Sequence, residues 1–541
     1  MIIDCLPDAD SAAHDVCVVG AGPVGLTLAL ELARAGRKVV VLESGGTAAD
    51  PVTQSLSRAE LNDSRVHDEV EITLSRQLGG TSNLWGARCQ PFDPIDFVPR
   101  EVTGFARWPI GINDLRPHYP AACSYVRCGE PDFMLADPEA PSAEFDTSRI
   151  ERFSREPAFQ RAHAKALRDT PGLRIHLHNS VTGARLSMDG RIAELQLVRP
   201  DGTRASFSVN RLVLAMGGLE TARLLLNIQT EHPGLFGGLN GPLGRYYMAH
   251  VVGEISDIHW ARETGDASYD FLRDSDGGYS RRRMIPSDKE IVAHNLPNVS
   301  FWPVVPGVAD ATHGEPLLSL AFLAMAFRPV GNRLVAEAIR RYHAPPGTPV
   351  GPHLNNLCRG LPGAVLKGSE LFYRRMVQRP KIPGFFIRNP ERRYGLSYHA
   401  EHFPAYSSHV RLSKDIDATG LRRLIVDLRF SRADSDALLR AHKRLALWLT
   451  ANGLGNLAFR QPVEEASDAI LDLATHGTHQ IGLTRMGIDR HDAVVDLNLR
   501  AFDVPNLYVV GSSVFVTSGQ ANPTLTAMAL AVRLAQHLRR G

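Results

Sequence analysis

The stretch that decides the fold runs from Asp15 to Glu43 and reads DVCVVGAGPVGLTLALELARAGRKVVVLE. The apolar run DVCVV predicts a buried strand, LTLALELARAG predicts a helix, and KVVVLE predicts a second strand that ends at Glu43. A glycine-rich turn, Gly20-Ala21-Gly22-Pro23-Val24-Gly25, joins the first strand to the helix. Strand, glycine turn, helix and strand in this order indicate the start of a doubly wound parallel sheet.

Each glycine of this turn has a physical reason. Gly20 permits the tight turn, Gly22 lets the backbone approach a pyrophosphate, and Gly25 lets the helix pack close to the strand, with the phosphates at the helix N-terminus. Glu43 lies 18 residues after Gly25, where a carboxylate accepts hydrogen bonds from a ribose diol and repels a 2′-phosphate. The pattern predicts a dinucleotide whose adenosine lacks that phosphate, and alone it does not separate FAD from NAD.

Composition and charge exclude several classes of protein. Hydrophobic residues make up 44% of the 541 and charged residues 22%, as in ordinary globular domains. The 60 Lys and Arg against 58 Asp and Glu leave a formal charge of +2, so no bulk field favours nucleic acid as a partner. Six cysteines are few, and Cys123 and Cys128 lack metal-finger spacing, which predicts reduced thiols and no metal site.

The first residues and the apolar stretches predict a cytoplasmic protein without an integral membrane segment. The beginning, MIIDCLPDADSAAHD, is polar and acidic where a signal peptide needs a basic and then an apolar region. The longest nearly continuous apolar stretch, Leu317 to Phe327, has 11 residues, whereas a membrane span needs about 20.

The rest of the chain predicts one nucleotide-binding domain interrupted by a substrate domain. Short strands around the turns Asp189-Gly190 and Asp201-Gly202 lead to a strand, RLVLAMGG, and a helix, ETARLLL. From about residue 260 the sequence is richer in Pro, Arg and aromatics, and NVSFWPVV and LSLAFLAMAF resemble strands. A strand, NLYVVGSS, and a helix, TLTAMALAVRLAQHL, close the chain. The expected parts are residues 1–110, 161–258 and 464–541 for cofactor binding, 111–160 for a lid or oligomerisation segment, and 259–463 for the substrate domain.

A basic segment lies inside the expected substrate domain. Residues 331–395 hold 12 Lys and Arg and three acids, as a docking face for an anionic membrane surface, an acidic redox partner or a phosphorylated substrate would. The alternative is an ordinary solvated helix face, because RLVAEAIRRYH has the pattern of an amphipathic helix. The aromatic residues Trp302, Phe385, Phe386 and Tyr406 could stack on a sugar ring, although aromatics in such a pattern are more often part of a core.

Several separate motifs resemble the glucose–methanol–choline (GMC) oxidoreductases. Gln77 to Gly86, QLGGTSNLWG, resembles the second flavin-contacting loop of that superfamily, and Trp108 to Tyr119 resembles its lid-flanking segment. Val213 to Leu226 is similar to its strand-and-helix return to the FAD. His479 to Gly487, HQIGLTRMG, together with Gln520 to Thr526, QANPTLT, most resembles the pyranose oxidase branch, which includes sugar and glycoside dehydrogenases.

The resemblance implies an α/β fold in which a Rossmann-type FAD-binding domain is interrupted by a substrate domain with a mostly antiparallel sheet, as in p-hydroxybenzoate hydroxylase. It implies FAD as cofactor and oxidation of a CH–OH group of a sugar or glycoside, with hydride transfer to flavin N5. For Thr81 and Asn83 simple turn chemistry is the alternative, and for Val181 a place in a core strand. The expected cofactor contacts are Gly20, Gly22, Gly25, Glu43, Ser44, Gly80, Thr81, Asn83, Val181, Gly217, Gly511, Ser512, Pro523 and Thr524.

The resemblance also implies a catalytic pair. His479 occupies the position of the family's active-site base, and Asn522 occupies that of its hydrogen-bonding partner. An imidazole suits the role because its pKa lies near neutral pH. His476 is a rival base, and either histidine could instead be structural. Asn-Pro-Thr at 522–524 also predicts a helix N-cap with proline at the first helical position, which is compatible with catalysis.

Two departures from the family pattern bear on the cofactor. Leu84 stands where some members attach FAD covalently through a histidine, which predicts a dissociable FAD. Gly86 stands where the pyranose oxidases carry a threonine near flavin N5, so oxygen, a quinone or another carrier all stay open as the electron acceptor. A non-sugar alcohol, as in natural-product tailoring, is an alternative substrate. A flavin monooxygenase or a non-catalytic flavoprotein would leave the region from His479 to Asn522 unexplained.

Overall fold

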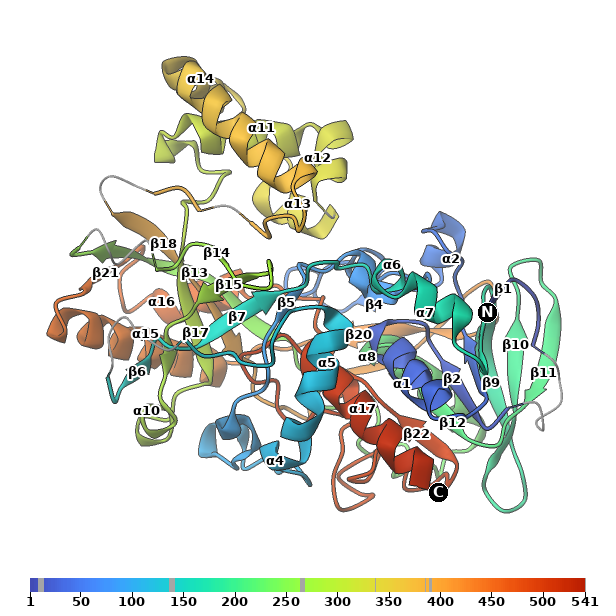
Figure 1. The fold of residues 1–541 in the computed structure, drawn as a ribbon. Helices are drawn as coiled ribbons and strands as arrows, with labels where there is room; N and C mark the ends of the chain where they lie inside the picture. Colours follow the sequence, from blue (N-terminus) through green and yellow to red (C-terminus); the bar gives the residue numbers. More distant parts are fainter. Residues whose placement is uncertain are drawn as a thin grey trace.

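A computed structural model describes residues 1–540 apart from 8–13, 136–141, 263–267, 336, 385 and 389–391. Its centre is a six-stranded parallel sheet in the order β1-β8-β3-β2-β12-β22 (Figure 1). The strands are β1 (Ile2–Ile3), β2 (Val16–Val19), β3 (Val39–Leu42), β8 (Leu173–His176), β12 (Leu212–Leu214) and β22 (Leu507–Val509). Segments from both ends of the chain therefore meet in one sheet, and the predicted α/β class is confirmed, although the predicted domain boundaries stay a prediction.

The glycine turn connects β2 to helix α1 (Pro23–Arg34) as its sequence predicts. Gly20 has a φ of +104°, a conformation that favours glycine. A Cβ added to Gly25 would lie 2.1 Å from the carbonyl oxygen of Gly20, so only glycine lets the helix begin this close to the strand. Helix α1 packs beside the C-terminal helix α17 (Thr524–Arg540) in the larger hydrophobic core.

The segment before β12 forms the antiparallel meander that its turns predict. Its strands are β9 (Ser180–Leu186), β10 (Ile192–Val198) and β11 (Arg204–Ser208). Helix α8 (Gly218–Glu231) follows β12 and contains the predicted helical stretch ETARLLL.

A mostly antiparallel region covers the carboxyl-end side of the parallel sheet and holds the second core. Its main sheet has the order β17-β18-β13-β21, and a second sheet has the order β14-β15-β7-β5. Helices α15 (Arg432–Ala451) and α16 (Ala466–Leu473) pack on the main sheet. The strands are β5 (Arg88–Cys89), β7 (Ile150–Phe153), β13 (His250–Trp260), β14 (Leu272–Arg273), β15 (Tyr279–Arg282), β17 (Val299–Val304), β18 (Arg393–Glu401) and β21 (Gly455–Phe459).

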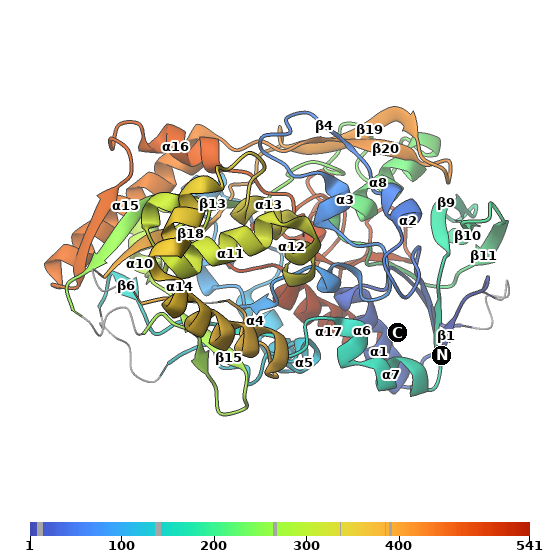
Figure 2. The ribbon, with the colours of Figure 1, turned by 90° about the horizontal axis from the view of Figure 1, so that it is seen from above.

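Four helices form a lobe that projects from this region (Figures 1 and 2). They are α11 (Pro316–Ala326), α12 (Arg328–Leu334), α13 (Glu337–His343) and α14 (Gly351–Phe372). The strand expected for LSLAFLAMAF is therefore wrong, since α11 includes this stretch up to Ala326. A short apolar run does not distinguish strand from helix, and this one contains no β-branched residue and follows a proline that suits the first helical position. The helix expected for RLVAEAIRRYH is divided between α12 and α13.

The two glycines of the turn are expected to respond differently to alanine. In Gly25→Ala the new methyl meets the Gly20 carbonyl, so we expect a loss of about 1–3 kcal/mol in the free energy of unfolding. Gly22→Ala is the matched control, because a Cβ there meets nothing within 4 Å. Thermal unfolding of both cofactor-free proteins, followed by circular dichroism, measures the difference. Equal stability of the two variants would contradict the packing role of Gly25.

Candidate active site

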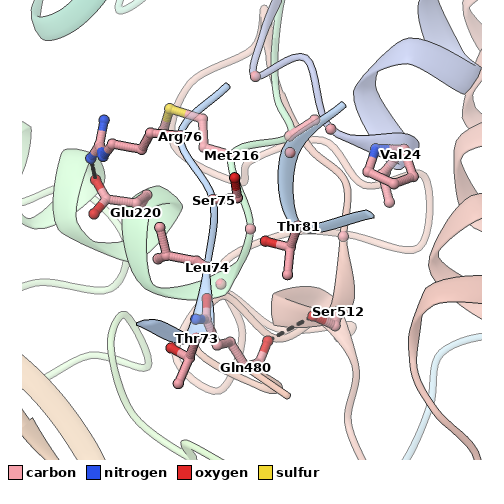
Figure 3. Close-up of a pocket in the computed structure, with 18 of the residues that line it drawn as sticks. Val24, Thr73, Leu74, Ser75, Arg76, Thr81, Met216, Glu220, Gln480 and Ser512 are labelled. Atoms are coloured by element: carbon pink, nitrogen blue, oxygen red, sulfur yellow. Dashed lines mark hydrogen bonds and ion pairs between the residues drawn. The ribbon is translucent and has the colours of Figure 1, made fainter. Parts of the chain in front are cut away.

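A cavity of about 650 Å³ lies at the carboxyl ends of the parallel strands, where sheets of this class bind ligands. Its wall includes the turn after β2, the end of β3, and the residues that follow β12 and β22. The N-terminus of α17 also reaches it through Asn522, Pro523 and Thr524. Figure 3 shows part of this wall, with Thr81, Gln480 and Ser512 around the space.

The cavity wall fits the adenosine and phosphates of a dinucleotide. Gly22 lines the cavity, and nothing lies within 4 Å of the point where a Cβ would stand. A phosphate could therefore approach the backbone at this residue. The Glu43 carboxylate also lines the cavity, fixed by the backbone N–H groups of Ala21 (2.9 Å to Oε2) and Gly45 (2.8 Å to Oε1). A carboxylate has about four lone-pair sites, so Glu43 keeps acceptors for a ribose diol.

Most predicted cofactor contacts are brought together here. The wall includes Gly20, Gly22, Glu43, Ser44, Gly80, Thr81, Val181, Gly217, Gly511, Ser512, Pro523 and Thr524. Gly25 lies below the wall in its predicted packing role. Asn83 is a correction: it does not line the cavity, because its amide donates to the carbonyls of Leu78 (3.2 Å) and Gly80 (2.8 Å). Turn chemistry, the alternative for this residue, explains its place.

A polar pair on the same wall is not among the residues that the sequence predicts for the site. Arg76 forms an ion pair with Glu220 of α8 (Figure 3). Its Nη1 donates to the Ser44 hydroxyl at 3.0 Å. Both side chains are largely buried. Neither belongs to a motif quoted above for its chemistry, so only the fold brings them together.

The predicted pair His479 and Asn522 faces the cavity, and Asn522 Nδ2 lies 3.2 Å from His479 Nε2. The rival His476 does not line the cavity, and its Nδ1 accepts from the backbone N–H of Thr478 at 3.3 Å. This placement favours His479. Arg88 Nε donates to the Oδ1 of Asn522. Helix α17 begins at Thr524, two residues after Asn522, and the N-cap role stays a prediction.

Arg88 determines the amide orientation of Asn522 and, through it, the tautomer of His479. A guanidinium can only donate, so it selects the oxygen of the Asn522 amide and turns Nδ2 toward His479. His479 Nε2 must then accept, which puts the ring proton on Nδ1. His479 Nδ1 lies 2.8 Å from Nδ1 of His250 in β13, which accepts that proton's hydrogen bond. The Nε2 lone pair is thus on the cavity side, where it accepts from Asn522, and a substrate hydroxyl would replace this bond to reach the base.

Four histidines surround this point: His250, His399, His476 and His479. Each offers a ring nitrogen within 4.8 Å of the others, as ligands of a metal ion do. Around a tetrahedral zinc with bonds of about 2.0–2.1 Å, however, ligand nitrogens stand about 3.3 Å apart, farther than the 2.8 Å between His250 and His479. His399 Nδ1 is also engaged with the Gln520 carbonyl at 2.6 Å. A hydrogen-bonded network accounts for the cluster, and the absence of a metal site stays a prediction.

Three arginines cluster near Asn522, and one of them, Arg88, lines the cavity. Arg88, Arg281 and Arg283 share one ion-pair partner among the described residues, the fully buried Glu151. All three guanidinium groups lie over the Trp302 ring, at 5.4, 5.3 and 3.5 Å from its centre. Burial lowers the pKa of Arg88 to about 9, and the charge of Arg281 adds to this effect. Burial also lowers the pKa of Arg281 to about 9, while the charge of Asp270 acts in the opposite direction.

The aromatic residues proposed as stacking partners for a sugar have other environments. Trp302 is buried among the arginines, and Phe386 stacks on Tyr394 at 4.9 Å beside the second core. Tyr406 donates from its hydroxyl to the carbonyl of Asn240 at 2.8 Å. None of the three lines the cavity, and Phe385 lies outside the described residues.

Comparison with protein families identifies two parts of the chain. Residues 404–531 match the family described as GMC oxidoreductase, in its C-terminal domain, and residues 15–97 match the family described as FAD dependent oxidoreductase. The solved pyridoxine 4-oxidase from Mesorbium loti has the same fold, with a TM-score of 0.52 at 17% identity over 98% of this chain and 99% of that one.

Curated relatives match over nearly the whole chain or over short parts of it. The 2-methyl-1,2-propanediol dehydrogenase of Mycolicibacterium austroafricanum is 22% identical, with 97% of this chain and 95% of the relative covered. The 6'''-hydroxyparomomycin C oxidase of Streptomyces lividus is 25% identical, with 98% and 93% covered. The pyranose 2-oxidase of Lyophyllum shimeji is 40% identical over 60 residues, which are 11% of this chain and 10% of the relative.

These findings and the cavity define a flavoprotein oxidoreductase that uses FAD. Residues 404–531 form a GMC oxidoreductase C-terminal domain, and residues 15–97 belong to an FAD dependent oxidoreductase domain; GMC oxidoreductases act on CH–OH donors. The residues of the wall fit the cofactor, and Leu84 lines the cavity without a group that could form a covalent link.

The buried histidines predict how stability depends on pH. Burial lowers the pKa of His442 to about 4 and of His476 to about 3, and lowers the pKa values of His250, His399 and His479 well below 6.5. Below pH 6.5 the unfolded chain binds protons that the folded protein does not, so stability is complete above that pH and falls below it. Each group removes about 1.4 kcal/mol per pH unit until its folded pKa is reached.

Urea unfolding at several pH values measures this dependence. We expect the free energy of unfolding to decrease continuously from pH 7 to pH 5, and His442→Gln, at a buried site outside the cavity, to reduce the slope by the share of one histidine. A free energy that is constant over this range would contradict the burial of neutral histidines.

Proposed function

We propose that the protein oxidises a CH–OH group of a sugar or glycoside to the carbonyl, with His479 as the base. The observation that carries the proposal is the His479–Asn522 pair, because its hydrogen bonds leave the Nε2 lone pair on the cavity side. His479 would take the hydroxyl proton at Nε2, and Asn522 Nδ2 would donate to the hydroxyl oxygen. When bound, FAD supplies the acceptor for the hydride that leaves the same carbon.

The protonation state of His479 supports its role. Burial, followed by the charges of His476, His250 and Arg88, lowers the pKa of its imidazole well below the ordinary value. The ring is therefore neutral at physiological pH, as a base must be before it takes a proton, but it is a weaker base than the imidazole with a near-neutral pKa that the sequence analysis expects. His250 acts as a positioning residue, because its Nδ1 accepts from His479 Nδ1 and holds the ring in the required tautomer. We further propose that FAD is bound without a covalent link, since leucine at position 84 cannot form one.

The charge of the wall narrows the class of sugar. Arg88 lines the cavity, and Arg281 and Arg283 lie with it around the Glu151 carboxylate, so a cationic amino sugar would meet a locally positive part of the site. A neutral sugar avoids this repulsion, and an anionic one would relieve it. The electrostatics therefore favour neutral or anionic sugars over the amino sugars that one relative's name indicates. The diol dehydrogenase among the relatives keeps a small non-sugar alcohol as the second candidate.

The test uses three sugars of the same ring that differ in charge: glucose, glucuronate and glucosamine. Each is mixed without oxygen with the purified holoenzyme, and the visible absorbance of the bound flavin is followed. We expect glucose or glucuronate to bleach the flavin at least ten times faster than glucosamine, which corresponds to about 1.4 kcal/mol of discrimination. Admitting air afterwards separates an oxidase from a dehydrogenase.

Two arginine variants make the test specific. Arg281→Gln removes one charge of the cluster and should reduce the discrimination against glucosamine. Arg152→Gln is the control, because Arg152 lies on the neighbouring strand and is paired with Asp274 at 2.8 Å. Fastest reduction by glucosamine would contradict the charge argument. If only simple alcohols or diols reduce the flavin, the sugar proposal is wrong, and a small non-sugar alcohol is the substrate class instead.

A further inference from the structure

The helical lobe, residues 316–384, exposes apolar side chains to an unusual degree. Of the 25 exposed large hydrophobic residues among the described parts of the chain, 11 belong to it, although it comprises only 69 of the 541 residues. The lobe projects from the rest of the molecule (Figures 1 and 2), so neighbouring elements do not cover it. Exposed apolar surface that is concentrated in this way indicates a binding surface.

The exposed apolar residues of α14 form a stripe. After the kink at Gly360, Leu361, Val365 and Phe372 are spaced by four and seven residues, which puts them on one face of the helix, and Leu354 is exposed before the kink. In this order, the four side chains are 47%, 55%, 58% and 48% exposed. Helix α14 packs against α11 through other residues, among them His353, whose Nδ1 lies 3.2 Å from the Ser319 hydroxyl. The stripe is therefore not the face that stabilises the lobe.

The charge of the lobe complements an anionic surface. Residues 316–384 contain ten Lys and Arg and two acids, whereas the whole chain is almost balanced. On α14 the basic residues Arg359 and Lys367 are exposed, and Glu370 is its single acid. An apolar stripe on a helix with exposed basic residues is the pattern of a helix that lies in a membrane interface beside anionic lipids.

Two features of the described structure bear on membrane docking: the character of its helices and the connection between the lobe and the cavity. No helix in the described parts of the chain is long and apolar enough to cross a membrane. Helix α14 is kinked at Gly360, where the backbone leaves helical φ and ψ. Helix α13 connects the lobe to the cavity, because its Tyr342 lines the cavity and its Arg341 forms an ion pair with Glu69 at 3.6 Å.

We propose that the lobe docks the protein on the anionic surface of a phospholipid bilayer, with the apolar stripe of α14 in the interface and the basic residues among the lipid headgroups. The protein then lies on the membrane without spanning it. Because α13 belongs to the same lobe, docking brings the cavity near the bilayer.

Vesicle co-sedimentation of the full-length holoenzyme tests this proposal. Vesicles of phosphatidylcholine alone are compared with vesicles that also contain phosphatidylglycerol. We expect the protein to sediment with the anionic vesicles, to bind phosphatidylcholine at least tenfold more weakly, and to dissociate as salt is raised.

Matched variants distinguish membrane binding through the lobe from nonspecific adsorption by exposed apolar residues. The pair Leu361→Ser with Val365→Ser, and separately Arg359→Gln with Lys367→Gln, should each weaken binding about tenfold or more. The control pair Leu447→Ser with Ile488→Ser changes residues that are 62% and 84% exposed outside the lobe, and should bind like the native protein. Unchanged flavin absorbance and thermal midpoint establish that each variant is folded.

Three results would overturn the proposal. One is the absence of binding to anionic vesicles, and another is binding that the lobe variants and the control pair change equally. The third is a dimer in sedimentation equilibrium that the Leu361/Val365 variant dissociates while vesicles do not bind, because a second copy would then cover the stripe. Retention on immobilised polyglutamate without vesicle binding would indicate an acidic protein partner and would also count against the membrane.

Discussion

The site depends on one constraint, which is that parallel strands end at the same edge of their sheet. Strands β2, β3, β12 and β22 come from distant parts of the chain, yet the residues that follow them all reach one cavity. This edge brings the glycine turn, the Glu43 carboxylate and the start of α17 around one ligand-sized space. The close approach of α1 to β2, which only glycine at position 25 permits, keeps this geometry.

The second feature is a buried polar network that crosses from the parallel sheet to the antiparallel region. Arg88 orients the Asn522 amide, Asn522 sets the tautomer of His479, and His250 accepts the hydrogen bond of the single ring N–H, at Nδ1. Each partner restricts the next because a guanidinium only donates and a neutral imidazole both donates and accepts. The network thus holds a neutral imidazole with its Nε2 lone pair at the cavity. It also requires Arg88 to be buried, together with two further arginines that pair with Glu151.

Local patterns predicted the parts of this structure whose chemistry is contiguous in the sequence. The glycine turn, the position of Glu43 after β3 and the meander after β8 needed only neighbouring residues, and the structure shows each element where the sequence predicts it, while the cofactor contacts stay a prediction. Arg88, His250 and His399 could not be predicted, because they lie on strands whose pairing decides where they meet. The apolar run of α11 was assigned to a strand because its composition, without periodicity, fits both structures. Asn83 followed the family pattern, but its local hydrogen bonds turn it away from the cavity.

The proposed mechanism requires His479 as the base. The rate at which the best alcohol substrate reduces the bound flavin without oxygen, measured by rapid mixing, tests this requirement directly. The comparison is between His479→Gln and His476→Gln, two neighbouring histidines of which only the first lines the cavity. We predict that His479→Gln keeps its FAD and reduces it at least a hundredfold more slowly, while His476→Gln stays within a few fold of the native rate. Native reduction by His479→Gln with FAD bound would contradict the mechanism.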